Sequence, residues 1–258
     1  MLNKPIITTL IMATITIFVS HACMAVQQYV TDGLIGFWTM DRGDIQGAVV
    51  KDVSGENNHG KIGGDPKIVQ GKIEEALDFD GNDDFVELPN LGNEPAVSVE
   101  VWAIADQPFP DIRGLVSTFD PPQWKAGSVH FKFEANNIDI LKNDGGRIQI
   151  PAEPNIWYHI AYTSDTEINE LKLYVNGELI NKVNTGKELN NLTSLRIGSE
   201  HEGRYFPGIL DEVRIYNRAL SEKEIQQNYA VTANSLAVIA SSEKLSICWG
   251  KIKISGLN

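Results

Sequence analysis

Apolar and polar residues alternate along most of this chain, as they do in β-strands that turn one face toward a core. The stretch 97–102 (VSVEVW) places a valine at every second position, and 171–175 (LKLYV) repeats the pattern. Runs of this kind, separated by Gly, Asn, Asp and Pro, occupy 33–40, 76–81, 85–89, 97–104, 115–119, 129–135, 138–142, 147–150, 157–164, 171–180, 194–199 and 209–216. Many short strands with turn residues between them predict an all-β fold, either an antiparallel sandwich or a barrel.

Two local patterns predict a hairpin and one short helix. Asn176-Gly177 stands between two apolar runs, and this pair is a strong signal for a two-residue hairpin turn. Near the C-terminus, Ser221 and Glu224 have the spacing of a helix N-cap and its capping-box partner. We therefore expect a helix within 219–230.

The strand-like stretch 206–216 (FPGILDEVRIY) carries a carboxylate in an apolar row. Read with a period of two, Ile209, Val213 and Ile215 share a face with Asp211. This reading predicts that the carboxylate points toward the core.

A buried carboxylate is costly unless it is hydrogen-bonded, paired or bound to a metal. The candidate partners of Asp211 are a divalent cation, the backbone amides of a neighbouring turn, and the side chains of Arg196 and Arg204. Arg214 alternates to the opposite face in this reading and is a poor partner.

Length and charge narrow the classes of function. The 258 residues, of which 42% are hydrophobic, suffice for one sizeable core, and sandwiches of roughly 200–250 residues are commonly single domains. The 34 acidic and 22 basic residues give a formal charge of −12, which argues against nucleic acid as a partner. This charge is compatible with divalent cations and with neutral ligands such as glycans; a solubilising surface charge is the alternative.

The first residues resemble an export signal. Lys4 is followed by an uncharged, mostly apolar run at 5–20, and small residues at Cys23 and Ala25 predict cleavage after Ala25. The apolar run is shorter than a membrane span of about 20 residues, so no transmembrane segment is expected in the mature chain. The alternative is a lipid anchor on Cys23, but Ser20 stands where that signal wants a bulky aliphatic residue. A secreted or cell-surface protein is expected.

Three segments follow from these patterns. We expect a signal peptide at 1–25, one domain at 26–230, and a tail at 231–258 whose pattern fits an extension, an extra strand or a short anchor. If cleavage follows Ala25, Cys248 is the remaining cysteine, and the fold then depends on its core and on any metal.

Oxygen-rich stretches could hold a cation. The segment 52–62 is dense in Asp, Asn, Ser and Gly, and 76–89 carries four aspartates within seven residues. Carboxylates this close shift each other's protonation unless a cation or hydrogen-bond donors lie among them. Calcium prefers six to eight oxygen ligands, although the spacing is not that of an EF-hand. The alternative is a set of polar turns facing water. The histidines and cysteines form no zinc-type cluster.

Several motifs together resemble the bacterial laminin-G-like domains of the concanavalin A-like lectin/glucanase group. In order along the chain they are 33–41, 52–62, 71–89, 98–103, 157–163, 171–180 and 195–225. The resemblance covers about 33–229, and it implies a jelly-roll sandwich of two antiparallel sheets braced by a structural calcium ion. The implied ligands are Asp211, the loop around Asn58, and one of Asp41, Asp52 or Asp80.

The resemblance leaves three classes of function: a module that binds carbohydrate or mediates adhesion, a structural or protein-interaction domain without glycan binding, and a polysaccharide-degrading enzyme. Related glucanases carry a Glu-x-Asp-x-x-Glu or Glu-x-Asp-x-Glu strand motif, and no stretch of this sequence matches it. Glu100 has no acidic neighbour at an even spacing until Asp106. We therefore expect a non-catalytic binding module whose partner is a glycan or a cell-surface protein.

Candidate ligand residues come from loop-like sequence. Sugar sites combine an aromatic platform with polar side chains that fix the orientation of the ligand. Arg113, Trp124 and Tyr205 offer these groups, and the alternative for the two aromatic rings is packing under their own loops.

Overall fold

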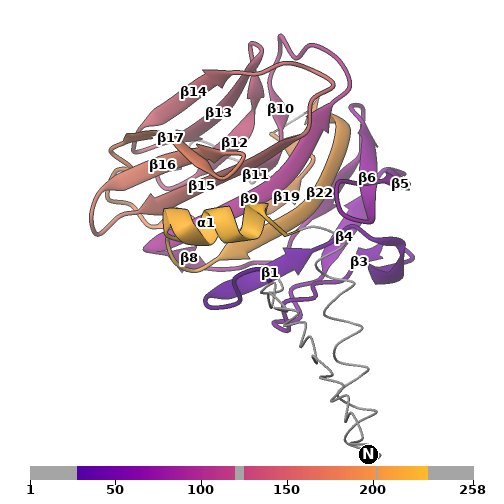
Figure 1. Cartoon of the computed structure of the whole chain (residues 1–258), viewed down its shortest axis with the longest axis horizontal. Coiled ribbons are helices and arrows are strands. Elements are labelled where there is room, and N and C mark those ends of the chain that lie inside the picture. The colour runs from indigo at the N-terminus through magenta and orange to yellow at the C-terminus, as the bar shows by residue number, and fades with distance from the viewer. Residues whose placement is uncertain (1–27, 120–124, 202, 232–258) are drawn as a thin grey trace, which may run out of the picture.

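A computed structural model describes residues 28–119, 125–201 and 203–231 of the chain. The predicted signal peptide, the tail after residue 231, and Trp124 lie outside the described residues. Hydrogen-bonded sheets build two layers that face each other across one core (Figure 1).

The first layer is an eight-stranded antiparallel sheet, called the large sheet below. Its strands are β1 (Leu34–Trp38), β5 (Lys67–Gln70), β6 (Glu75–Asp80), β9 (Ala96–Ala105), β15 (Tyr158–Asp165), β16 (Glu170–Val175), β17 (Glu178–Val183) and β22 (Pro207–Tyr216). They lie in the order β17-β16-β15-β9-β22-β6-β5. One edge of β22 is shared, because its first half pairs with β6 and its second half pairs with β1.

The second layer combines two sheets. The four-stranded sheet contains β10 (Arg113–Gly114), β12 (Val129–Glu134), β13 (Asn137–Lys142) and β14 (Arg147–Pro151). The six-stranded sheet contains β2 (Ile45–Gln46), β3 (Val49–Val50), β4 (Gly60–Gly63), β7 (Phe85–Glu87), β11 (Val116–Thr118) and β19 (Leu195–Ile197). The hydroxyl of Ser117 joins the two sheets, since it donates to the carbonyl of Phe131 at 2.8 Å and accepts from the amide of Phe131 at 3.0 Å.

Two short strand pairs and two helical segments complete the fold. The pairs are β8 (Asn93–Glu94) with β18 (Asn190–Asn191), and β20 (Ser199–Glu200) with β21 (Arg204–Tyr205). The helical segments are a 3₁₀ turn at Arg42–Asp44 and α1 at Glu222–Tyr229. This architecture confirms the predicted jelly-roll sandwich with one short helix near the end of the domain.

The local predictions are confirmed by backbone geometry. Asn176 and Gly177 have φ angles of 52° and 81° and form the tight turn between β16 and β17. At the start of α1, the hydroxyl of Ser221 accepts from the amide of Glu224, whose carboxylate accepts in return from the amide of Ser221. Each of the predicted strand runs contains a strand, whereas the short strands β4 and β5 arise in sequence that had no clear alternation.

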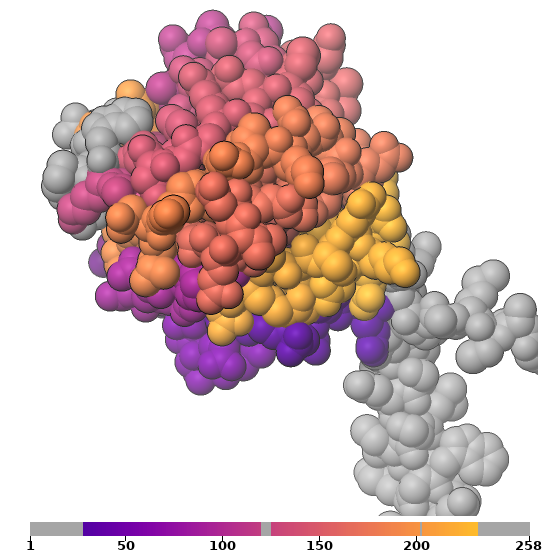
Figure 2. Space-filling view, turned by 90° about the vertical axis from the view of Figure 1, so that its left-hand side faces the viewer, coloured from indigo at the N-terminus to yellow at the C-terminus, as the bar shows by residue number. Residues whose placement is uncertain are grey.

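A second apolar cluster covers the outer face of the large sheet, which is the face turned away from the second layer. It joins α1 and the N-terminal segment to the sheet (Figures 1 and 2), and its buried members are Val30, Leu34, Phe37, Ala161, Tyr174, Tyr216, Leu220 and Ile225. In the space-filling view, the yellow C-terminal part of the described chain lies against the indigo N-terminal part. The helix therefore shields polar groups that the outer face would otherwise expose to water.

The predicted orientation of Asp211 is wrong, because a β-bulge breaks the alternation of β22. Glu212 has a φ of 55°, and the register of β22 against β9 shifts between Asp211 and Arg214. A bulge adds one residue to a strand and so moves later side chains to the other face. Val213 therefore points into the main core, whereas Asp211 pairs with Trp102 on the outer face.

Candidate functional site

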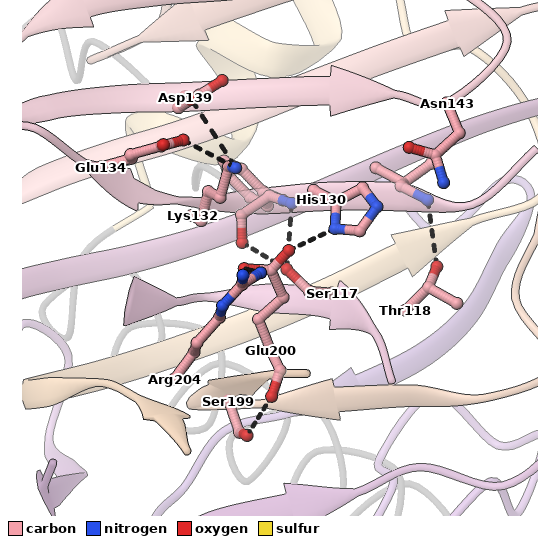
Figure 3. A network of polar contacts seen from close by, with 12 residues as sticks. Ser117, Thr118, His130, Lys132, Glu134, Asp139, Asn143, Ser199, Glu200 and Arg204 are labelled. Carbon is pink, nitrogen blue, oxygen red and sulfur yellow. Dashed lines mark hydrogen bonds and ion pairs between the residues drawn. The ribbon is translucent and has the colours of Figure 1, made fainter. Parts of the chain in front are cut away.

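The outer face of the four-stranded sheet carries a layer of polar side chains (Figure 3). Strand β12 alternates, so that Phe131 and Phe133 pack in the main core while His130 and Lys132 point to the opposite face. His130 and Lys132 are nonetheless almost completely buried, with exposed fractions of 0% and 2%. Polar groups at this depth need partners, and the surrounding segments supply them.

His130 is paired with a carboxylate from the β20–β21 hairpin. Its Nδ1 atom forms a hydrogen bond with the carboxylate of Glu200, and both side chains are fully buried. Arg204 reaches the other oxygen of Glu200 at 3.4 Å. Burial alone would raise the pKa of Glu200, but the hydrogen bond from His130 and the nearby cations bring it below its usual value. The hairpin is therefore held on the sheet by an ionised carboxylate.

A second set of ion pairs lies further along β12. The ammonium group of Lys132 is 2.8 Å from Glu134 and 3.9 Å from Asp139. Arg147 donates hydrogen bonds to both of these carboxylates. Glu134 and Asp139 are thus engaged by two cations that belong to the protein itself.

A pocket opens beside this polar layer and is called the Arg113 pocket below. Its volume is about 420 Å³. It is lined by Pro110, Asp111, Ile112, Arg113, Glu134, Ala135, Gly203 and Arg204. These residues come from the β10 segment, the β12–β13 turn and the β20–β21 hairpin, so the pocket exists only when three distant parts of the sequence meet.

Local backbone features hold the three segments in place. Ala135 and Asn136 have φ angles of 50° and 60° and form the tight β12–β13 turn. The side chain of Asn136 accepts from the amide of Phe109 at 3.0 Å, which fastens the segment before β10 to this turn. Gly114 allows the hairpin to approach β10, because a Cβ there would lie 2.2 Å from the amide nitrogen of Glu200.

The predicted ligand residues separate in the structure. Arg113 lines the pocket, as expected for a ligand residue. The ring of Tyr205 stacks on Phe85, with centroids 6.4 Å apart, and does not line the pocket. Its neighbour Arg204 lines it instead, and the sequence had suggested Arg204 only as a partner for Asp211. Adjacent residues of a strand point to opposite faces, so strand alternation is the signal that could have assigned Arg204, rather than Tyr205, to the pocket.

Asp211 is held by backbone amides, which is one of the alternatives that the sequence left open. One oxygen of its carboxylate accepts from the amides of Lys72 and Ile73, both at 2.9 Å. The other oxygen is buried and has no hydrogen-bond partner. Burial and the charge of Glu212 raise the pKa of Asp211 well above its usual value.

The arginines expected near Asp211 are engaged elsewhere. Arg196 pairs with Glu87 at 2.8 Å, and Arg204 faces Glu200. Neither pairs with Asp211, so of the open alternatives these two arginines are not its partners. Arg196 lies in β19 of the second layer, and Arg204 lies in the β20–β21 hairpin.

The other predicted metal ligands fall into separate groups. The charge of Asp41 acts on Asp211, and one oxygen of Asp41 accepts from the amide of Glu75 at 2.8 Å. Asp52 organises its own loop, where its oxygens accept from three backbone amides, including that of Asn58 at 2.8 Å. The side chain of Asn58 donates to a backbone carbonyl in β1.

Asp80 belongs to a third group. Within the described residues, Asp80, Asp83 and Asp84 form the single set of three acidic or histidine ligands whose atoms lie within 4.8 Å of one another. Both oxygens of the buried Asp84 already accept from backbone amides, at 2.7 and 3.0 Å. Asp41, Asp52 and Asp211 therefore do not form a comparably tight group.

Comparison with known families and structures gives the wider context. A model of the family described as the concanavalin A-like lectin/glucanases superfamily matches residues 80–226, more than half of the chain. None of the curated proteins matches in sequence. In the part of the chain that the structure describes, no helix is both long enough and apolar enough to cross a membrane.

Solved structures of similar fold include domain 4 of AbnA, a GH43 extracellular arabinanase from Geobacillus stearothermophilus, in complex with arabinotriose. That domain is 20% identical, with a TM-score of 0.61 over 76% of this chain and 98% of its own. The binding domain of Paraclostridial Mosquitocidal Protein 1 is 19% identical, with a TM-score of 0.61 over 77% of this chain and 52% of its own.

A third similar structure is the binding domain of botulinum neurotoxin DC in complex with SialylT. It is 15% identical, with a TM-score of 0.62, and the match covers 78% of this chain and 51% of that one. The present chain thus spans about half of each of the two toxin domains. At these identities the likeness is one of fold.

Proposed function

Since the chain belongs to the concanavalin A-like lectin/glucanases superfamily, we propose that it is an exported, non-catalytic module that binds carbohydrate at the cell surface. The observation that carries the proposal is the Arg113 pocket, a hollow of about 420 Å³ with charged side chains at its wall. Sites for small ligands commonly have volumes of about 300–1,000 Å³ and a few fixed polar groups that orient the ligand. Similar domains include one solved with arabinotriose and one solved with SialylT, and this supports a glycan as the ligand.

The polar layer beside the pocket is better suited to binding than to catalysis. A glycoside hydrolase needs one carboxyl group that donates a proton and a second carboxylate that acts as nucleophile or base. Glu134 and Asp139 are held by Lys132 and Arg147, so neither is free to act in this way. Incubation with a panel of polysaccharides should release no new reducing ends or unsaturated products.

Export rests on the N-terminal pattern, in which an apolar run precedes the small residues around Ala25. Mass spectrometry of the mature N-terminus tests it. A terminus at Val26 supports the signal peptide, an acylated Cys23 supports the lipid anchor, and an intact Met1 overturns export.

Glycan binding is tested with purified protein on a glycan array. We expect reproducible binding to at least one sugar, and at least a tenfold loss of affinity in an Arg113→Ala variant, because its guanidinium lines the pocket. Arg42→Ala is the matched control, since its side chain is 66% exposed and pairs with an exposed carboxylate outside the pocket. Binding that persists in Arg113→Ala places the site elsewhere. Capture of a protein partner with no sugar bound would favour the protein-interaction alternative.

A structural calcium ion is the second part of the proposal. The carboxylate of Asp211 fits a cation, because one of its oxygens is buried without a partner and the charge of Asp41 lies near it. Calcium prefers carboxylate and carbonyl oxygens, and these two carboxylates would supply the negative charge at the point where β22 changes partner from β6 to β1. The proposed role of the calcium ion is to stabilise the sandwich.

Chelation measures the calcium contribution. We expect the melting temperature to fall in EDTA and to recover with added calcium, since a ligand at 100 times its Kd stabilises the native state by about 2.7 kcal/mol. Asp211→Asn should remove this response, because the amide carries no charge. Asp80→Asn, in the exposed aspartate group, should retain it. An unchanged melting temperature in EDTA would contradict the calcium proposal. The carboxylate of Asp211 would then be stabilised by the amides of Lys72 and Ile73 alone.

A further inference from the structure

We propose that the Arg113 pocket binds the carboxylate of an acidic sugar, such as a uronic acid; this inference rests on the proposed carbohydrate-binding function. Two arginines, Arg113 and Arg204, line the pocket. Their side chains are 26% and 29% exposed, so both reach solvent from partly buried positions.

Both of these arginines use little of their hydrogen-bonding capacity. Each guanidinium offers five N–H donors. Among the described residues, the side chain of Arg113 makes no hydrogen bond, and its one ion pair, with Asp111, has a distance of 3.7 Å. Arg204 makes a single contact, at 3.4 Å, with Glu200.

The remaining arginines of the chain each have a closer carboxylate partner. Each donates to a carboxylate at 3.2 Å or less, and they are Arg42, Arg147, Arg196, Arg214 and Arg218. Two nitrogens of Arg214, Nε and Nη1, also have no hydrogen-bond partner, but Arg214 is fully buried and cannot meet a ligand. Among the arginines that reach solvent, the longest pairing distances are those of Arg113 and Arg204. A partly buried guanidinium with free donors is suited to a ligand that brings its own acceptors.

The carboxylates near the pocket do not satisfy this demand. Glu134 is engaged by Lys132 and Arg147, and Glu200 is engaged by His130. Asp111 is 77% exposed and lies beyond hydrogen-bond distance of Arg113, so an incoming carboxylate can replace it at small cost. Arg113 and Arg204 therefore keep most of their donors available, although each faces one carboxylate, Asp111 or Glu200.

A carboxylate matches these donors better than a hydroxyl does. Hydrogen bonds between a guanidinium and a carboxylate are charge-assisted, about twice as strong as neutral ones, and often bidentate. A neutral sugar would occupy the same volume but would offer only neutral acceptors to the two guanidinium groups. The pocket is therefore expected to discriminate by charge rather than by size.

The test uses one set of oligosaccharides in two forms. The full chain is titrated by calorimetry with uronate- and sialate-bearing oligosaccharides, and with the same compounds after their carboxyl groups have been converted to methyl esters. We expect at least one acidic compound to bind at least tenfold more tightly than its ester, with affinity that falls as salt is added. Arg113→Gln and Arg204→Gln should each lose at least tenfold in affinity, whereas Arg42→Gln should lose none.

The outcomes separate this inference from the proposed function. Equal binding of acid and ester, or binding of neutral sugars alone, overturns charge recognition and leaves carbohydrate binding standing. Acid-selective binding that survives both Arg113→Gln and Arg204→Gln overturns the assignment to this pocket. If no sugar of any kind binds, both proposals fail. Arg113→Gln is also expected to fold normally, because the side chain of Arg113 makes no hydrogen bond within the described chain that the substitution could break.

Discussion

Replacing Arg214 by Ala is expected to lower the free energy of unfolding by about 3–5 kcal/mol, the usual range when one partner of a buried ion pair is removed. Arg214 is fully buried on the outer face of the large sheet. Its guanidinium pairs with Glu212 and lies over the rings of Phe37 and Tyr29, with its central carbon 4.3 and 5.3 Å from their centroids. Its removal leaves buried carboxylates without a cation, and it also leaves a void beside the two rings.

Chemical denaturation of matched variants measures this effect. Arg42→Ala removes an exposed ion pair with Glu75 and should change stability by about 0–1 kcal/mol. A triple variant, Arg214→Met with Glu100→Gln and Glu212→Gln, should recover much of the loss, because a neutral cluster of similar volume is often as stable as a buried ion pair. A loss below 1 kcal/mol in Arg214→Ala would show that the buried charge contributes little net stability.

The position of Arg214 could not be predicted from the sequence because of one residue, Glu212. The alternation of β22 predicts that Arg214 and Asp211 lie on opposite faces, but the bulge at Glu212 places both on the outer face. Gly or Asn would have signalled a positive φ, whereas Glu rarely adopts one. The tertiary contacts of Glu212 and Arg214 stabilise this conformation, and no local rule reports them.

The fold itself was predictable because its determinants are local. Alternation within each strand, the Asn176-Gly177 turn and the capping box at Ser221 are each contained in fewer than ten residues. The Arg113 pocket was only half predictable. Arg113 stands in loop-like sequence, but the role of Arg204 depends on how the β20–β21 hairpin folds back over β10, a contact that brings together distant parts of the chain.

The same outer face predicts an unusual pH dependence of stability. Burial, opposed by the charge of Arg214 and the hydrogen bond from Asn228, raises the pKa of Glu100 to about 7. Burial and the charge of Arg214 lower the pKa of His159 to about 3, and neither ring nitrogen of His159 has a hydrogen-bond partner. Glu100 favours the native state at low pH, and His159 favours it at high pH.

The sign for each group follows from linkage. The unfolded chain protonates Glu100 only near pH 4.5, so its contribution to stability is complete below that pH and is lost as the pH rises through about 7. The contribution of His159 is complete above its unfolded pKa of 6.5 and is lost as the pH falls toward 3. The two contributions therefore oppose each other between pH 4.5 and 6.5.

Two substitutions separate these opposing contributions when urea denaturation is followed from pH 4.5 to 8 in the presence of EDTA. Glu100→Gln removes the acid-favoured contribution, so the variant should gain about 3 kcal/mol relative to wild type as the pH rises across this range. His159→Phe keeps an aromatic ring between Trp102 and Tyr229 and should gain a similar amount as the pH falls. Stability differences that do not vary with pH would show that both groups titrate as they do in water. Opposite slopes would show that the helix and the N-terminal segment seal the outer face well enough to raise the pKa of Glu100 and to keep His159 neutral.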